Sequence, residues 1–120
     1  MNAKNYAIAY DKLSRACDLQ PDATEYQMGA GMAAAKLGNR SAADKHFETA
    51  ARHLSQRSLK DPEAVDDYAL VLACLGRNAE AITVFKEGRK HFPNAPNLIQ
   101  LDPELDEFLM LWAVEYGPNN

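Results

Sequence analysis

The sequence predicts an all-α protein, built as an α-solenoid of antiparallel helix pairs. A motif of a small, a large apolar and a second small residue occurs three times, at Ala9-x3-Leu13-x2-Ala16, Ala43-x3-Phe47-x2-Ala50 and Ala81-x3-Phe85-x2-Gly88. The copies begin at positions 9, 43 and 81, and a period in the mid-thirties is typical of helix-pair repeats. A Leu-Gly pair precedes the second and third copies, and no segment has the alternation of a strand. These observations favour a repeat array over a single globular core.

Helical periodicity predicts six helices, with bounds at 3–19, 23–37, 40–57, 62–75, 78–91 and 103–116. The first, third and fifth carry the recurring motif. Gly38 and Gly76 are expected to end the second and fourth helices, because glycine adopts positive φ at little cost after a helix. The chain then turns back into an antiparallel partner helix. The spacing between the second and third copies is the larger one, and it predicts a longer helix or loop at residues 56–60.

Aspartate followed by proline marks two helix starts. Asp61 and Asp102 are expected as N-caps, with the following proline in the first turn. Residues 92–101 contain two prolines, which we expect to prevent a helix there. This linker is predicted to lay apolar side chains against the end of the array, namely Leu98, Ile99 and Leu101.

The motif and the Leu-Gly turns together resemble the tetratricopeptide repeat over about residues 5–95. The resemblance implies one domain of about two and a half repeats plus a C-terminal capping helix, divided at 1–21, 22–61, 62–95 and 96–120. Gly31 and Ala69 occupy the family's close-packing position between the two helices of a repeat. The chain departs from the family pattern where aromatic residues are expected, at Gln27, Val65, Ala34 and Leu72.

Charge and composition limit where in the cell the protein can be located and which partners it can bind. The net charge is −4, and residues 91–120 hold five acidic side chains and neither Lys nor Arg. No apolar stretch has the length that a membrane-spanning helix needs, and charged side chains such as Lys4 and Asp11 interrupt the N-terminal segment. We therefore expect neither a membrane segment nor a signal peptide. We expect a cytoplasmic protein, unless the chain is a fragment of a longer one. Cys17 and Cys74 are too few for a disulfide framework and are expected as buried thiols.

No constellation of residues predicts catalysis, a metal or a cofactor. His46 and His53 lie two helical turns apart on one helix, so about 10 Å separates them along its axis, too far to share an ion. The acidic pairs at 66–67 and 106–107 point about 100° apart on their helices instead of converging. We expect them on solvated faces and near helix N-termini. Gly29 and Gly31 lie within a helix, whereas a phosphate-binding loop follows a strand. We expect no enzyme.

Nucleic-acid binding is also disfavoured. The helices at 40–57 and 78–91 carry many basic side chains, but acidic ones are interleaved with them. Mixed signs on a helix exterior are typical of a solvated face, and a pI of 5.3 opposes binding to phosphates.

The resemblance implies a concave groove lined by the first helix of each pair. Its inward positions in this sequence are Glu25, Met28, Met32, Ala35, Glu63, Asp66, Leu70 and Ala73. A groove with acidic and soft apolar side chains suits an apolar or basic protein segment. The apolar members could instead serve packing between repeats. The carboxylate-binding function of some family members is not expected, since residues 62–75 contain no Lys, Arg or Asn.

The ends of the array offer a second hypothesis. The last predicted helix carries an apolar stripe of Leu105, Phe108, Leu109, Trp112 and Tyr116. This helix could cap the last repeat or contact another chain. Tyr6 and Tyr10 occupy the opposite end, on a helix that either caps the array or continues from missing repeats. Association through Tyr6, Tyr10, Phe108 and Trp112 would give a self-assembling scaffold and a homo-oligomer. A third possibility is a non-catalytic region of a larger enzyme or regulator.

Overall fold

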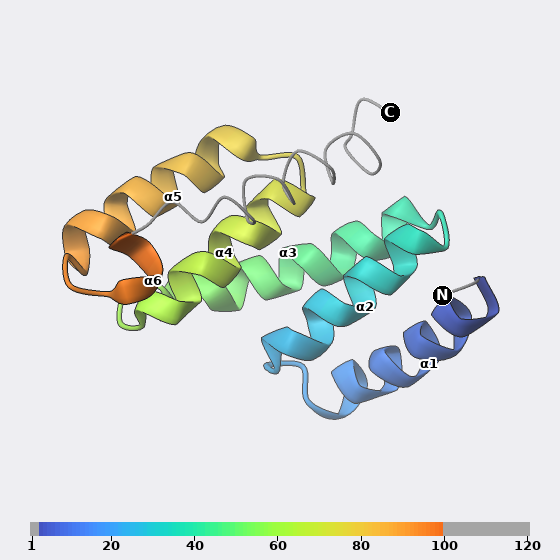
Figure 1. The fold of residues 1–120 in the computed structure, drawn as a ribbon. Coiled ribbons are helices and arrows are strands. Elements are labelled where there is room, and N and C mark those ends of the chain that lie inside the picture. The colour runs from blue at the N-terminus through green and yellow to red at the C-terminus, as the bar shows by residue number, and fades with distance from the viewer. Residues whose placement is uncertain (1–2, 100–120) are drawn as a thin grey trace. The chain divides into compact units, whose positions relative to one another are not determined.

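The computed structural model describes residues 3–99, and within this range every regular element is a helix (Figure 1). The helices are α1 (Ala3–Leu19), α2 (Thr24–Lys36), α3 (Arg40–Arg57), α4 (Pro62–Cys74), α5 (Asn78–His91) and α6 (Pro96–Ile99). The bounds of the first five differ from the predicted ones by at most one residue at either end. The predicted helix at 103–116 lies outside the described residues.

The chain divides into two compact units, and the division falls inside α3. Unit 1 is Met1–His53 and unit 2 is Leu54–Asn120. Each unit is a set of neighbouring antiparallel helices. In unit 1, α1 lies beside α2, and in unit 2, α4 lies beside α5 (Figure 1).

The helices of unit 1 approach closely at glycine. A Cβ atom on Gly31 of α2 would lie 2.6 Å from Cε1 of Phe47 on α3, closer than van der Waals contact allows. Gly29, on the same helix, faces Leu13 of α1, and a Cβ atom on Gly29 would lie 3.2 Å from Cδ1 of Leu13. Phe47 is 1% exposed, so the aromatic ring of the recurring motif fills the space that the missing side chain leaves.

Unit 2 repeats this construction with different residues. Ala69 of α4 belongs to a buried cluster with Leu72, Ala73 and Ala81, and Phe85 packs against that cluster. The close approach to glycine is on α5, where a Cβ atom on Gly88 would lie 2.6 Å from Cγ1 of Val65. The motif therefore occupies the helix–helix contact in both units.

Helix α6 corrects the prediction that prolines keep residues 92–101 from forming a helix. Pro96 is the first residue of α6, the one helical position where proline costs nothing because its N–H would have no partner anyway. Leu98 is 1% exposed and lies in a cluster with Val65 and Ala95. Its carbonyl oxygen accepts a hydrogen bond from Nε of Arg89, at 2.6 Å. The expectation that Leu98 packs against the preceding helices is confirmed.

Helices α2 and α4 end in the same turn. Gly38 has φ of 79° and Gly76 has φ of 82°, the left-handed conformation that was expected of them. In the first turn, Asn39 N donates to Ala34 O at 2.9 Å and Gly38 N donates to Ala35 O at 3.0 Å. The second turn has the corresponding bonds, from 77 to 72 and from 76 to 73. Both are Schellman motifs, which satisfy the last carbonyl groups of the helix.

These two turns define how positions in the two units correspond. The separation in sequence between Gly38 and Gly76 is here called the repeat offset, and it also relates Phe47 to Phe85 and Gly31 to Ala69. A residue and its counterpart at the repeat offset therefore occupy matching places on matching helices.

The start of α4 also follows the prediction. Asp61 is its N-cap, and the carboxylate accepts a hydrogen bond from Glu63 N at 3.0 Å, with Pro62 in the first turn. Asn39 plays the same part for α3, since its Oδ1 accepts from Ala42 N at 3.1 Å.

The two cysteines are buried, as expected, and no disulfide joins them, with Cys17 in unit 1 and Cys74 in unit 2. Burial raises the pKa of the Cys17 thiol, and the neighbouring carboxylate of Asp18 raises it further. Across residues 3–99, none of the helices combines the length and the apolarity that crossing a membrane requires.

Candidate binding surface

The residues expected to line a groove differ in how much surface they present. Glu25 and Glu63 are exposed, in the first turns of α2 and α4. Half-buried positions hold Met28, Met32, Asp66 and Leu70, whereas Ala35 and Ala73 are buried. The first four residues of the set belong to unit 1 and the last four to unit 2. Each unit therefore presents its own face, on α2 in unit 1 and on α4 in unit 2.

Met32 and Leu70 occupy the same place in an identical burial pattern. Of the positions from 31 to 35 in α2, only Met32 is not buried, and of those from 69 to 73 in α4, only Leu70 is not. When only one position in such a stretch of helix is accessible, a polar residue is ordinarily found there. Both helices show a large apolar side chain instead.

The acidic residue Asp66 is bonded within unit 2. Nδ2 of Asn97 on α6 donates to Oδ2 of Asp66 at 2.7 Å and also lies 2.9 Å from the carbonyl oxygen of Pro62. Asp66 therefore holds α6 against the start of α4. Next to it, burial raises the pKa of the Asp67 carboxyl, and the charge of Asp66 raises it further. Sequence reasoning assigned no part to Asn97, and an asparagine in a Pro-Asn linker gives no signal of such a bond.

The proposed end interface is only partly within the described residues. Tyr6 and Tyr10 of α1 are half-buried. The hydroxyl of Tyr10 lies 3.2 Å from Nε2 of His46, and the two rings meet edge to face with centroids 5.6 Å apart. Phe108 and Trp112 lie outside the described residues.

A chain of hydrogen bonds runs through unit 1 with His46 at its centre. Nδ1 of His46 lies 2.9 Å from Oε1 of Gln27, and Nε2 of Gln27 donates to the carbonyl oxygen of Pro21 at 3.3 Å. Because the Pro21 carbonyl can only accept, it fixes the orientation of the Gln27 amide. His46 must then donate from Nδ1, and in the neutral imidazole Nε2 accepts from the Tyr10 hydroxyl. The arrangement suits a neutral imidazole, and burial lowers the pKa of His46.

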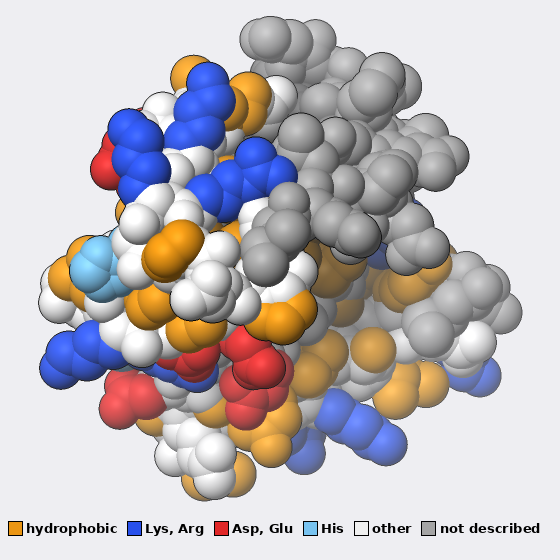
Figure 2. All heavy atoms as spheres, turned by 60° about the vertical axis from the view of Figure 1, so that its left-hand side comes forward, with side chains coloured by type: hydrophobic (Ala, Val, Ile, Leu, Met, Phe, Trp, Pro, Cys, Tyr) orange, Lys and Arg blue, Asp and Glu red, His pale blue; other side chains and the backbone are white. Residues whose placement is uncertain are grey.

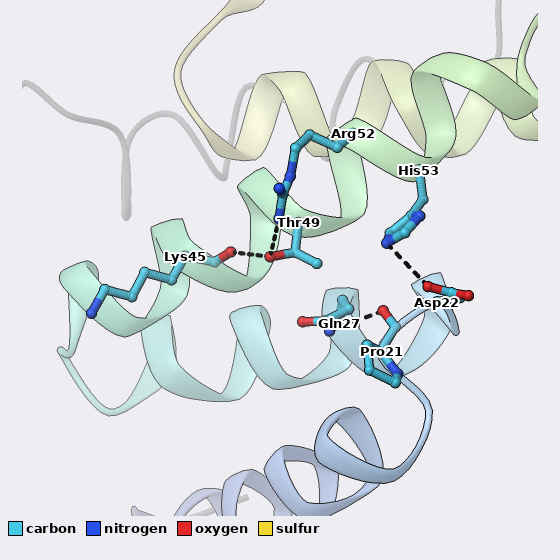
Figure 3. Close-up of polar contacts among 7 residues, drawn as sticks. All are labelled: Pro21, Asp22, Gln27, Lys45, Thr49, Arg52 and His53. Carbon is cyan, nitrogen blue, oxygen red and sulfur yellow. Dashed lines mark hydrogen bonds and ion pairs between the residues drawn. The ribbon is translucent and has the colours of Figure 1, made fainter.

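The loop between α1 and α2 is held from two helices. Figure 3 shows Gln27 of α2 directed at Pro21 and His53 of α3 directed at Asp22, with Nε2 of His53 3.6 Å from Oδ1 of Asp22. Elsewhere on α3, Thr49 donates to the carbonyl oxygen of Lys45 at 3.0 Å and accepts from Arg52 at 3.4 Å. His46 and His53 are thus engaged in structural contacts within unit 1.

The corresponding place in unit 2 is apolar and partly open. At the repeat offset, Val65 and Val84 are the counterparts of Gln27 and His46. These valines help to line a cavity of about 400 Å³, together with Ser55, Ser58, Leu59, Tyr68, Thr83, Glu87, Gly88 and His91. Unit 1 fills this place with a polar network, whereas unit 2 does not.

No group of three His, Cys, Asp or Glu side chains among residues 3–99 is arranged to hold a metal ion. Charged pairs on the helix surfaces are local, as in Arg40 with Asp44 at 3.0 Å and Arg15 with Asp11 at 3.4 Å. No family model, no curated protein and no solved structure matches this chain.

Proposed function

We propose that this protein is a non-enzymatic, tetratricopeptide-like helical-repeat module that binds a segment of another protein. The residues that we propose for binding are Met32 with Met28 and Glu25 on α2, and Leu70 with Glu63 on α4. What supports the repeat architecture is the recurrence, at one repeat offset, of the Schellman turn, the small residue at the helix contact and the motif phenylalanine.

The observation that carries the binding proposal is the accessibility of Met32 and Leu70. Each is the one position that is not buried within a run of consecutive helical residues, 31–35 or 69–73, and each bears a large apolar side chain. Burying a fully exposed side chain of this kind contributes roughly 1.5–3 kcal/mol, and Met32 and Leu70, which are already half-buried, would contribute part of that. Methionine is flexible and polarisable, so Met32 can adapt to side chains of different shapes.

The charges beside these positions indicate the chemistry of the partner. Glu25 and Glu63 are exposed, each about two turns before the apolar position on the same helix. A partner segment with an apolar anchor and a basic side chain at a similar distance would match both features. Charge would orient the segment and speed its association, and apolar burial would supply the affinity.

The test compares partners captured by the wild-type chain with those captured by Met32→Arg and Leu70→Arg. Arginine at either position keeps a long side chain, but it places a charge where an apolar anchor is expected. Ile82→Arg is the matched control, because Ile82 is an exposed apolar residue of α5 that lies outside the proposed faces. Far-ultraviolet circular dichroism establishes that each variant is folded.

The expected result is a set of partners, identified by mass spectrometry, that is lost with Met32→Arg or Leu70→Arg and retained with Ile82→Arg. Glu25→Gln and Glu63→Gln are expected to weaken the same partners at low salt more than at high salt. Partners retained equally by all folded variants would refute both faces as binding sites.

A further inference from the structure

Unit 2 contains a cavity at the place that unit 1 fills with its polar network. It is here called the unit 2 cavity, and its volume of about 400 Å³ falls in the range of about 300–1,000 Å³ that is typical of small-molecule sites. Its lining comes from the end of α3 with the loop that follows, from α4 and from α5. Every described lining residue belongs to unit 2, so the cavity is a property of this unit alone.

Two valines make the inner part of the cavity apolar. Val65 is 1% exposed, and a Cβ atom on Gly88 would lie 2.6 Å from its Cγ1, so Val65 is packed tightly against α5. Val84 is half-buried. In unit 1 the counterparts of these valines are Gln27 and His46, whose longer side chains reach each other. The shorter valine side chains leave part of the same space open in unit 2.

A leucine and a tyrosine extend the apolar lining toward solvent. Leu59, in the loop after α3, is 65% exposed. Tyr68 of α4 is half-buried and packs against the buried cluster of unit 2 that contains Leu72. A ligand with an apolar body would remove the surface of Leu59 from water, which favours binding.

Two hydroxyl groups at the cavity are placed to accept hydrogen bonds. Oγ of Ser58 donates its proton to the carbonyl oxygen of Ser55 at 3.1 Å, and Oγ1 of Thr83 donates to the carbonyl oxygen of Ala79 at 3.0 Å. A hydroxyl group has one proton and two lone pairs, so each of these oxygens retains only the capacity to accept. The two side chains therefore favour a ligand that donates hydrogen bonds.

Glu87 of α5 sets the charge at the cavity. The described lining residues include no other Asp or Glu and no Lys or Arg, and His91 can accept at a ring nitrogen when it is neutral. Nζ of Lys90 lies 3.9 Å from Oε1 of Glu87, but both side chains are mostly exposed, so this ion pair is weak. Figure 2 shows hydrophobic side chains exposed between acidic and basic ones on the face that it presents. Charges of both signs thus occur on the surface, and the one at the cavity favours a cation.

We propose that the unit 2 cavity binds a small molecule with an apolar body and an ammonium group. The apolar body would lie against Val84 and Leu59. The ammonium group would donate to the carboxylate of Glu87 and to the oxygen of Thr83, which lies one helical turn away on the same side of α5. The ring of Tyr68 would add the attraction of an aromatic face for a cation. The cavity shares no residue with the faces proposed for protein binding, so ligand binding and partner binding can be tested separately.

The test uses 2-phenylethylamine as the probe and 3-phenylpropionate as its matched control. The two molecules have the same ring and the same two-carbon chain, and they carry opposite charges at neutral pH. Each is titrated into the full-length protein at neutral pH while the amide chemical shifts are recorded by NMR. We expect 2-phenylethylamine to give saturable shifts at 55–59, 65–68 and 83–91, and 3-phenylpropionate to bind several-fold more weakly. Shifts that do not saturate or that lie outside unit 2, or equal binding of the two molecules, would overturn the proposal.

Ethylamine tests the part of the apolar body, because it carries the ammonium group without the ring. We expect ethylamine to bind at least several-fold more weakly than 2-phenylethylamine at the same amides. Equal binding of the two amines would mean that exposed carboxylates attract any cation, and it would overturn the cavity as the site.

A variant that fills the cavity locates the apolar body. Val84→Phe places a larger apolar side chain at the cavity, and Ile82→Phe is the matched control, because Ile82 is an exposed apolar residue of the same helix that does not line the cavity. We expect Val84→Phe to abolish the saturable shifts and Ile82→Phe to retain them. Retained affinity in a folded Val84→Phe variant would overturn the site.

A variant that removes the charge locates the ammonium group and requires no repacking, because Glu87 is exposed. Glu87→Gln keeps the size of the side chain, and Glu80→Gln makes the same change at an exposed position of α5 that does not line the cavity. We expect Glu87→Gln to weaken binding of 2-phenylethylamine several-fold without weakening that of 3-phenylpropionate, and Glu80→Gln to leave both at the wild-type values. Unchanged affinity for the amine in Glu87→Gln, or an equal loss in both variants, would overturn the selection of a cation by this cavity.

Discussion

His46 and Gln27 are joined by a hydrogen bond of 2.9 Å between Nδ1 and Oε1, at two positions whose counterparts at the repeat offset are both valine. Gln27 is 5% exposed and Val65 is 1% exposed, so both residues lie in the interior of their helix pairs. The two units therefore solve one packing problem in two ways. Unit 1 uses a directional contact that also reaches Tyr10 and Pro21, and unit 2 uses apolar side chains in the same place.

The hydrogen bond predicts non-additive effects of substitution. Gln27→Val leaves Nδ1 of His46 and the carbonyl oxygen of Pro21 without this partner, and His46→Val leaves Oε1 of Gln27 without one. Each single variant should lower the free energy of unfolding by about 1–3 kcal/mol, the cost of a buried polar group that loses its bond. Urea denaturation of the full chain measures both.

The double variant Gln27→Val with His46→Val reproduces the residue pair of unit 2. It should cost less than the sum of the single variants by about 1 kcal/mol or more, because it removes both polar partners together. Strict additivity would show that the 2.9 Å contact contributes nothing of its own.

The pKa of His46 predicts how stability depends on pH. Burial lowers the pKa of His46 below its ordinary value of 6.5, and the carboxylate of Asp18 offsets part of this effect. Around that pH the unfolded chain therefore binds more protons at His46 than the folded chain does. The stabilisation is fully present above the unfolded pKa and is lost as the pH falls through it, down to the folded pKa.

The measurement is the urea midpoint at pH about 7.5 and about 5.5, a range above the ordinary titration of carboxylates. The wild-type midpoint should be lower at the lower pH, and His46→Val should show a smaller decrease. His91→Gln, at an exposed position, is the control. An unchanged decrease in His46→Val would assign the pH dependence to other groups.

The two glycines of α2 predict different outcomes for the same substitution. Gly31→Ala brings a methyl group to 2.6 Å from the buried ring of Phe47, and overpacking of this kind costs about 1–3 kcal/mol. In Gly29→Ala the nearest atom is the flexible end of Leu13 at 3.2 Å, and alanine is favoured over glycine within a helix by about 1 kcal/mol. Thermal unfolding should show a lower Tm for Gly31→Ala and little change for Gly29→Ala. A reversed order would contradict the close approach of α2 and α3.

Asn97 predicts a local effect on α6. Its Nδ2 group bonds both Asp66 and the carbonyl oxygen of Pro62, so Asn97→Ala should release α6 from the start of α4. Hydrogen exchange of the amides of 97–99 should become faster, with little change in α2. Asn94→Ala, at an exposed position of the preceding loop, is the control. Unchanged exchange in Asn97→Ala would show that Leu98 and Arg89 suffice to hold the helix.

The helices were predictable because their ends depend on single residues with strong conformational preferences. Gly38 and Gly76 take the positive φ that ends α2 and α4, and Asp61 with Pro62 starts α4. Such signals are local and remain visible without knowledge of the fold. The short helix α6 differs from the prediction for a related reason, since Pro96 is the first residue of the helix, a position where proline is tolerated.

Contacts between distant residues were harder to predict. The sequence suggests His46 only as a possible metal ligand and Gln27 only as a departure from the aromatic pattern, yet the two side chains bond to each other across the helix pair. The repeat offset does indicate a relation between them, because it aligns Gln27 and His46 with two valines, Val65 and Val84. The division inside α3 and the bond from Asn97 to Asp66 depend on packing in space, and no residue pattern indicates them.

The two buried cysteines give the wild-type protein a chemical probe in each unit. Cys17 lies in unit 1 and Cys74 in unit 2, and neither forms a disulfide. A thiol reagent can modify each only when its surroundings open, so the two labelling rates report two opening equilibria. Equal rates after correction for thiol reactivity would mean that the units open together, and unequal rates would mean that one opens while the other stays closed.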